Sequence, residues 1–250
     1  MTVSIALRAG AAGLALLLVS HPVPPVARAQ QMMPGPTPTA DALATQMRIL
    51  GSNPRDVAAL IAAGDLSTRL GDLAAAMSFF GRAQAIDPGN PRLAAGRAGA
   101  LVASQRPGEA LRLYEVAERA GLAMEPYLAQ RGLAYDLLGQ SGHAQRDYRR
   151  ALTRDQDDET LRRLALSLGI SGQREEALQV LDPLLRRSDR AAWRARAFVL
   201  AIGGDVAGAQ RIATSMMVGG GGLTPFFGRL ASLSPADRAF AVHFGEIGTN

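Results

Sequence analysis

The chain has 250 residues and a formal net charge of +5, with 48% hydrophobic but only 5% aromatic residues. All 27 basic residues are Arg, and there is neither Lys nor Cys. These absences exclude a Walker A phosphate loop, a Schiff-base lysine, a thiol nucleophile, a disulfide and a thiolate zinc site. The weak charge imbalance and scarce aromatics argue against a nucleic-acid partner. Abundant Ala, Leu, Arg and Gln with few β-branched residues predict an all-α fold.

Residues 1–29 have the pattern of a secretory signal peptide. Arg8 supplies the n-region charge, residues 9–19 form an apolar run, and Ala27-Arg28-Ala29 gives an A-x-A cleavage motif. The run has about half of the ~20 residues needed to span a bilayer, so cleavage is favoured over a lasting membrane anchor. We expect a bacterial protein that is periplasmic or secreted after cleavage near Ala29, followed by a flexible linker over 30–40.

A recurring spacer, in which Gly precedes Ala by five residues, dominates the rest of the chain. It occurs at Gly71/Ala76, Gly139/Ala144, Gly172/Ala177 and Gly204/Ala209, with Gln105/Ala110 in the remaining slot. The alanines are separated by 34, 34, 33 and 32 residues, a period typical of stacked helical hairpins. Each Gly is expected to end a first helix with φ > 0. Before the repeats, Asp41 is expected to N-cap a short helix from about Ala42 to Leu50.

The solenoid is predicted over residues 41–218, and the spacer defines five repeats within it. Their approximate ranges are 57–90, 91–124, 125–157, 158–189 and 190–218. Repeat one has Leu60, Ala63, Gly64, Gly71, Ala76, Phe80, Ala83 and Pro88; repeat three has Leu128, Gly132, Tyr135, Gly139, Ala144, Tyr148 and Ala151. This order of small and large residues resembles the tetratricopeptide repeat. The resemblance implies a right-handed α-solenoid of about five repeats with a concave inner face.

The same resemblance suggests where a partner would bind. In tetratricopeptide repeat proteins, peptides bind the concave face through positions 2, 5, 9, 12 and 13 of each first helix. The charged candidates at those positions are Asp65, Arg69, Arg92, Asp136, Arg162 and Arg194. Other inner positions are small or apolar, such as Ile61 and Leu133. A groove of this kind suits a helix or an extended segment of a protein partner.

No catalytic, cofactor-binding or metal-binding residues are expected. The sequence contains no nucleophile, base and orienting group in a recognisable set, and no metal-ligand spacing. His21, His143 and His243 lie far apart, and the last two are expected on the solvated surface. The arginines around Asp147 in repeat three are expected on a solvated convex face with acidic neighbours.

The C-terminal part is expected to close the array. Residues 219–223 form a Gly linker, and 224–250 form a helical cap and tail. Ser234 as N-cap, Pro235 at N1 and Asp237 at N3 predict a helix start. Phe240 and Phe244 would share one face of this helix. The helix is expected to fold back over repeat five, and the alternative is a docking element for a partner.

These features predict a non-catalytic protein–protein interaction scaffold of the bacterial cell envelope, with no stable membrane span after signal cleavage. The layout is similar to that of Flp pilus assembly proteins of the TadD type, which implies a role in pilus assembly, although the lipobox Cys of lipidated members is absent. A scaffold of a secretion or exopolysaccharide export system is the alternative reading. An envelope hydrolase is the weakest candidate, because no catalytic set is present. The partner and the oligomeric state are not encoded in a readable motif.

Overall fold

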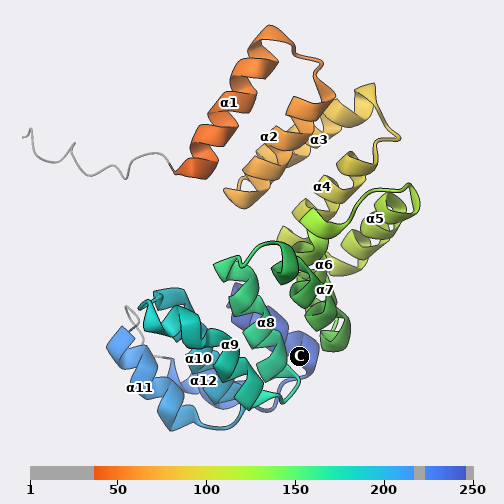
Figure 1. The fold of residues 1–250 in the computed structure, drawn as a ribbon. Coiled ribbons are helices and arrows are strands. Elements are labelled where there is room, and N and C mark those ends of the chain that lie inside the picture. The colour runs from red at the N-terminus through yellow and green to blue at the C-terminus, as the bar shows by residue number, and fades with distance from the viewer. Residues whose placement is uncertain (1–36, 217–222, 246–250) are drawn as a thin grey trace, which may run out of the picture. The chain divides into compact units, whose positions relative to one another are not determined.

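The computed structural model describes residues 37–216 and 223–245 (Figure 1). In these two segments the chain forms thirteen α-helices and one 3-10 turn, with no strand, which confirms the all-α prediction. The predicted signal peptide, most of the predicted linker and Gly219–Gly222 lie outside the described residues, and so do the last five residues of the tail.

The first helix, α1 (Pro38–Ser52), is longer than the sequence suggested. Thr37 is its N-cap, because the Ala40 N–H donates to Thr37 Oγ1 at 3.3 Å and Pro38 occupies N1. The prediction that Asp41 is the cap was therefore wrong. Asp41 lies in the first helical turn, where the positive end of the helix dipole stabilises its negative charge. Helix α1 also takes in residues 38–40, which had been assigned to the linker.

Five helical hairpins follow α1 along the chain (Figure 1). Their first helices are α2 (Val57–Arg69), α4 (Pro91–Ala103), α6 (Leu128–Leu137), α8 (Asp158–Ile170) and α10 (Arg190–Ile202). Their second helices are α3 (Leu73–Ile86), α5 (Pro107–Arg119), α7 (Ser141–Arg154), α9 (Arg174–Arg186) and α11 (Val206–Met216). The two helices of each hairpin pack together, and each hairpin also contacts the next. A 3-10 turn, η2 (Glu125–Tyr127), precedes α6. The described part of the chain is therefore an α-solenoid.

The hairpin turns explain the recurring glycine. After α2, the Gly71 N–H donates to the Thr68 carbonyl at 3.1 Å and the Asp72 N–H donates to the Ser67 carbonyl at 2.9 Å. This pair of bonds is a Schellman motif, which requires a left-handed residue. Gly71 has φ +80°, and the equivalent glycines have values between +72° and +86°, which confirms the predicted conformation. Gln105 takes the same place with φ +60°, so only the second repeat uses a non-glycine there.

Small residues allow the two helices of a hairpin to touch. A Cβ atom on Gly132 would lie 2.7 Å from Cε1 of Tyr148, and one on Gly64 would meet the Phe80 ring just as closely. The spacer alanines, including Ala76 and Ala144, have no exposed surface. Close approach and complete burial of the aromatic rings follow from these small residues, as the repeat pattern predicted.

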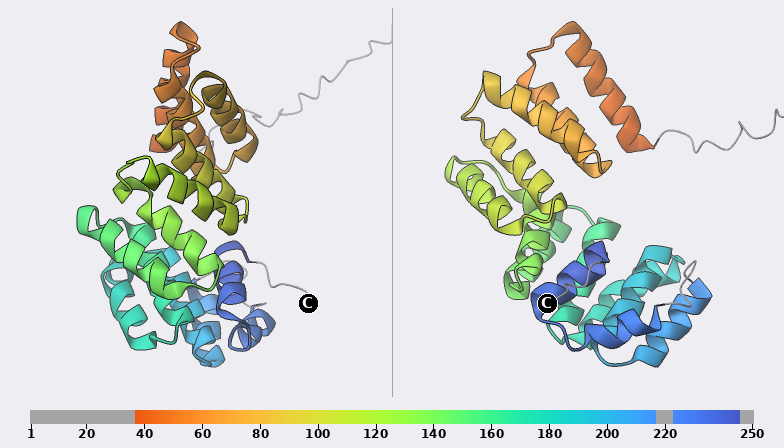
Figure 2. Two further views of the ribbon diagram at one scale, coloured as in Figure 1. Left: turned by 90° about the vertical axis from the view of Figure 1, so that its right-hand side faces the viewer. Right: turned by 180° about the vertical axis from the view of Figure 1, so that it is seen from behind.

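The chain ends with α12 (Thr224–Leu230) and α13 (Pro235–Phe244). Ser234 caps α13 by accepting the Asp237 N–H at 3.2 Å, as predicted, and the rings of Phe240 and Phe244 lie 6.0 Å apart. The predicted place of this helix needs correction. Helix α12 packs on α10 and α11 of repeat five, but α13 lies mainly on α6 and α8, with a smaller contact to α10 (Figure 2).

Candidate protein-interaction surface

The first helices α2, α4, α6, α8 and α10 form what we call the first-helix surface. Helix α13 covers α8, part of α10 and the C-terminal part of α6, and we call this region the covered half. The region of α2, α4 and η2 carries no such helix, and we call it the open half. The two halves have different side chains, so each is described in turn.

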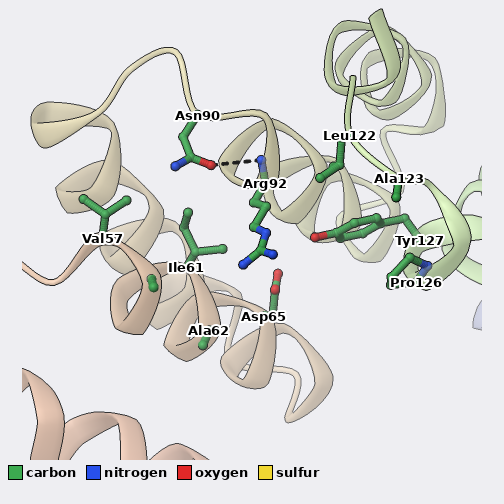
Figure 3. A pocket seen from close by; sticks show the side chains of 11 residues that line it. Val57, Ile61, Ala62, Asp65, Asn90, Arg92, Leu122, Ala123, Pro126 and Tyr127 are labelled. Carbon is green, nitrogen blue, oxygen red and sulfur yellow. Dashed lines mark hydrogen bonds between the residues drawn. The ribbon is translucent and has the colours of Figure 1, made fainter. Parts of the chain in front are cut away.

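The open half contains a cavity of about 500 Å³ between α2, α4 and the segment that leads into α6 (Figure 3). Its apolar wall includes Val57, Ile61, Leu122 and Tyr127, and its charged groups are Asp65 and Arg92. The size and the mixture of apolar and charged groups suit a side chain or short segment of another protein.

Asp65 and Arg92 give this cavity two opposite charges. Their side chains point toward one another from α2 and α4, with the Tyr127 ring beside them (Figure 3). Burial raises the pKa of Asp65 to about 6, although the positive charge of Arg69 opposes the shift. Burial and the negative charge of Asp65 also raise the pKa of Tyr127, and Arg92 opposes that shift. The backbone N–H of Arg92 donates to Asn90 Oδ1 at 3.0 Å. The side chain of Arg92 is exposed, and its guanidinium forms no hydrogen bond or ion pair among the described residues, so it is available to a ligand.

A second cavity of about 150 Å³ continues the open half and shares Asp65 and Tyr127 with the first. Tyr114 lines it, and the Tyr114 hydroxyl is buried without a hydrogen-bond partner among the described residues. The equivalent tyrosine of repeat three, Tyr148, donates to Asp136 Oδ2 at 3.1 Å. In repeat two the residue at the position of Asp136 is Val102, which has no acceptor side chain. The Tyr114 hydroxyl is therefore a buried polar group left unsatisfied among the described residues.

Asp136 was predicted to face a partner, and the structure contradicts this. Its side chain has no exposed surface and accepts hydrogen bonds from the Tyr148 hydroxyl and, at 2.7 Å, from Ser167 Oγ. Burial raises the pKa of Asp136 to about 7, even though both bonds favour the charged form. Asp136 therefore joins repeats three and four internally.

Arg162 and Arg194 lie at the covered half. Arg162 forms ion pairs with Asp189 at 2.6 Å and with Glu159 at 3.0 Å, so its charge is already matched. Both arginines line a cavity of about 70 Å³ that Val242 and His243 of α13 close. The six predicted residues are thus divided. Asp65, Arg69 and Arg92 are together in the open half, Arg162 and Arg194 border α13, and Asp136 is buried.

The ninth position of each repeat carries the signal that distinguishes the two halves. In the open half it is Asp65 and Gly99, whereas in the following repeats it is Leu133, Leu166 and Phe198. The last three are no more than 8% exposed and belong to the hydrophobic cluster that includes Ala239, Ala241 and Val242 of α13. Large apolar residues at the same inner position of successive repeats predict that another segment packs over them. The sequence analysis did not include this prediction.

Two further polar groups lie elsewhere than predicted. Asp147, expected on a solvated face, is buried and accepts two hydrogen bonds from Arg131, at 2.7 and 3.0 Å. Glu118 of repeat two accepts a third bond from Arg131 at 2.9 Å, so this cluster ties repeats two and three together. His243 of α13, expected at the surface, lies beside α8 and α10, and its Nε2 atom is shielded from solvent.

The described residues bring together no group of three or more His, Cys, Asp or Glu side chains that would hold a metal ion. In the same part of the chain, none of the helices has both the length and the apolar character needed to cross a bilayer.

The comparisons with known proteins agree with this architecture. Family models described as tetratricopeptide repeat match residues 60–122 and 126–158. A tetratricopeptide repeat protein from Parabacteroides merdae is similar in structure, with a TM-score of 0.55, 20% identity, and coverage of 84% of this chain and 86% of that one. This chain therefore contains tetratricopeptide repeats over residues 60–122 and 126–158. This fold is typically a non-catalytic repeat scaffold for protein–protein interaction.

A second solved structure, YrrB, described as a TPR protein with an unusual peptide-binding site, has a TM-score of 0.48 and 20% identity. The match covers 69% of this chain and 91% of YrrB. No curated protein matches the sequence.

Proposed function

We propose that this protein is a non-catalytic scaffold that binds a segment of a partner protein in the open half of its first-helix surface. The observation that carries the proposal is the cavity of about 500 Å³. In this cavity Asp65 and Arg92 point toward one another, and apolar side chains line the wall beside them (Figure 3). Beside α13, where Val242 and His243 lie against α8 and α10, the cavity is only about 70 Å³.

The chemistry of the cavity defines the ligand. An acidic side chain pairs with the exposed Arg92, and an apolar side chain packs on Ile61 and Tyr127. A basic group of the partner pairs with the Asp65 carboxylate, which borders both cavities. A partner segment with neighbouring acidic, apolar and basic residues satisfies all of these groups.

A displayed library of random peptides, selected on the full chain, tests this proposal. We expect enriched peptides to contain an acidic and an apolar residue in close succession. Arg92→Glu should weaken their binding at least about tenfold, since it replaces an attraction with a repulsion. Arg112→Glu, an equal change of charge on an exposed residue of α5, is the matched control. Peptides that bind Arg92→Glu and the unmodified chain equally would contradict the proposal.

The cellular setting is a separate part of the proposal. The apolar run, its single Arg and the Ala27-Arg28-Ala29 motif support export to the bacterial envelope, either periplasmic or secreted. The N-terminal residue of the protein recovered from its own cells, after fractionation, tests this directly. A start near Gln30 in an envelope fraction is expected, and an unprocessed cytosolic chain would contradict it.

Within the envelope, pilus assembly or secretion and polysaccharide export would each use such a scaffold. The genes beside it separate these pathways.

A further inference from the structure

Helix α13 lies on the covered half as a bound ligand would. It is a ten-residue helix that contacts the first helices of three successive repeats. It runs antiparallel to α8, because Arg238 donates to the Ile170 carbonyl at the C-terminus of α8, while His243 lies beside residues in the N-terminal half of α8. A short helix laid across the groove of a larger protein is a common mode of peptide recognition.

The buried face of α13 shows which helices this surface accepts. Ala239, Ala241 and Val242 are buried, and the paired rings of Phe240 and Phe244 are partly buried beside them. Small side chains let the helix approach α6 and α8 closely, and the aromatic rings add most of the apolar area. The matching partner is therefore a short helix with a face of small and aromatic residues.

His243 is the residue of this contact whose protonation would destabilise it. Its Nε2 atom is shielded from solvent and has no hydrogen-bond partner among the described residues. The α8 groups around it are Glu159, Arg162 and Arg163, and α10 contributes Arg194. The carboxylate of Glu159 is already bonded to both arginines of α8.

No other facing group compensates for a charge on His243. On α6, the buried Asp136 has its oxygens bonded to Tyr148 and Ser167. On α13 itself, Asp237 accepts from the Ser234 hydroxyl, and the Arg238 guanidinium donates to backbone carbonyls. A protonated imidazole would therefore be buried next to Arg163 and Arg194 without a counter-charge.

We propose that the covered half is a second partner-binding surface, that α13 is its internal ligand, and that protonation of His243 releases α13 so that a partner helix with the same small-and-aromatic face binds in its place. This surface is separate from the cavity of Asp65 and Arg92, and the proposal does not depend on the function assigned to that cavity.

The direction of the pH effect follows from linkage. Burial, with the charges of Arg163 and Arg194, lowers the pKa of docked His243 to about 3, whereas a solvated histidine titrates near 6.5. The released state therefore binds protons more strongly than the docked state. Docking is fully present above about pH 6.5 and weakens about tenfold for each pH unit below that, until pH approaches 3.

Amide hydrogen exchange of the full chain tests the release. After correction for intrinsic rates, protection of α13 at pH 5.5 should be about tenfold lower than at pH 7.5, while α2–α11 keep theirs. His243→Gln should remove this pH dependence, and His143→Gln should keep it, because His143 is exposed on α7. Protection of α13 that is independent of pH, or that is lost together with α2–α11, would overturn the proposal.

Binding in trans tests the second surface. The probe is a fluorescent peptide of residues 233–245 carrying His243→Gln, so that its own affinity does not change with protonation at this position. It should bind the full chain about tenfold more tightly at pH 5.5 than at pH 7.5, and Arg92→Glu in the chain should leave this binding unchanged. Equal affinity at both pH values, or loss of binding in Arg92→Glu, would overturn the proposal. The second result would place the peptide in the open half instead.

Discussion

The open and covered halves of the first-helix surface are built from the same helical hairpin but differ at corresponding positions. At the ninth position the open half has Asp65 and Gly99, and the covered half has Leu133, Leu166 and Phe198. At the aromatic position of the second helix, the Tyr114 hydroxyl has no partner among the described residues, whereas Tyr148 is hydrogen-bonded to Asp136. The comparison shows that the same repeat scaffold satisfies the tyrosine hydroxyl with an internal carboxylate in repeat three, and lacks that acceptor in repeat two, where Val102 takes the place of Asp136.

The largest effect is expected where the two halves join. Asp147→Ala would leave the guanidinium of Arg131 buried with only the half-exposed Glu118 as partner. Removing one member of a buried ion pair costs about 3–5 kcal/mol, and the remaining Glu118 contact favours the lower end. Denaturant unfolding of the variant measures the loss. Asp155→Ala, at an exposed position just after α7, should change stability by less than about 0.5 kcal/mol. Equal, small effects of both variants would show that the cluster does not join the repeats.

The two tyrosines provide the sharpest comparison between the halves. Tyr148→Phe removes a hydrogen bond to a buried carboxyl and should destabilise the chain by about 1–2 kcal/mol. Tyr114→Phe removes a buried hydroxyl without a partner, so stability should stay the same or rise slightly. Thermal unfolding of both variants measures this difference. A loss of stability in Tyr114→Phe as large as that in Tyr148→Phe would show that the hydroxyl of the open half is satisfied within the fold.

A smaller effect, and one that depends on pH, is expected for Asp65→Asn. Because the pKa of Asp65 is raised to about 6, its charged form destabilises the folded chain at neutral pH. The penalty is fully present above about pH 6 and disappears as pH falls toward the unfolded value near 4. The rise of the pKa from 3.8 to about 6 sets an upper bound of about 3 kcal/mol, and because the side chain is partly exposed, solvent screens much of it. The variant should therefore be more stable by about 1 kcal/mol at pH 7.5 and equal to the unmodified chain near pH 4. Denaturation midpoints across this range measure the gain. A gain that is constant with pH would mean that burial of the carboxylate is not its cause.

The pH dependence also separates the two surfaces. Acid neutralises Asp65 in the open half, which removes the negative charge that meets a basic ligand group. Acid protonates His243 in the released state of α13, which weakens the docking of α13 on the covered half. Mild acidification is therefore expected to weaken the binding of a basic ligand group in the open half and to make the covered half more accessible to a partner.

The repeats were readable from the sequence because each spacer residue has one local task. Gly71 and its equivalents accept φ > 0 at the turn, and Ala76 and its equivalents leave no room for a larger side chain. Such tasks depend on a few neighbouring residues, so a single sequence displays them. The N-cap of α13 at Ser234 was predictable for the same reason.

The surface was harder to predict, because the exposure of a residue depends on partners distant in the sequence. Asp136 occupies an inner position, but Tyr148 and Ser167 of other helices enclose it. The position of α13 depends on Leu133, Leu166 and Phe198, residues about 40 to 110 positions before it. These three residues were a usable signal, since three large apolar side chains at one inner position are not left exposed to solvent.

Two single-cysteine variants of the full chain test the division into halves most directly, because the natural sequence has no Cys. Gly99→Cys and Leu166→Cys place a thiol at the same repeat position in the open and covered halves. The first is tolerated, since the nearest atom to a Cβ there is 3.8 Å away. At pH 7.5 we predict that a thiol reagent modifies Gly99→Cys at close to the rate of a free thiol and Leu166→Cys at least about 100-fold more slowly. Similar rates at the two positions would contradict the account.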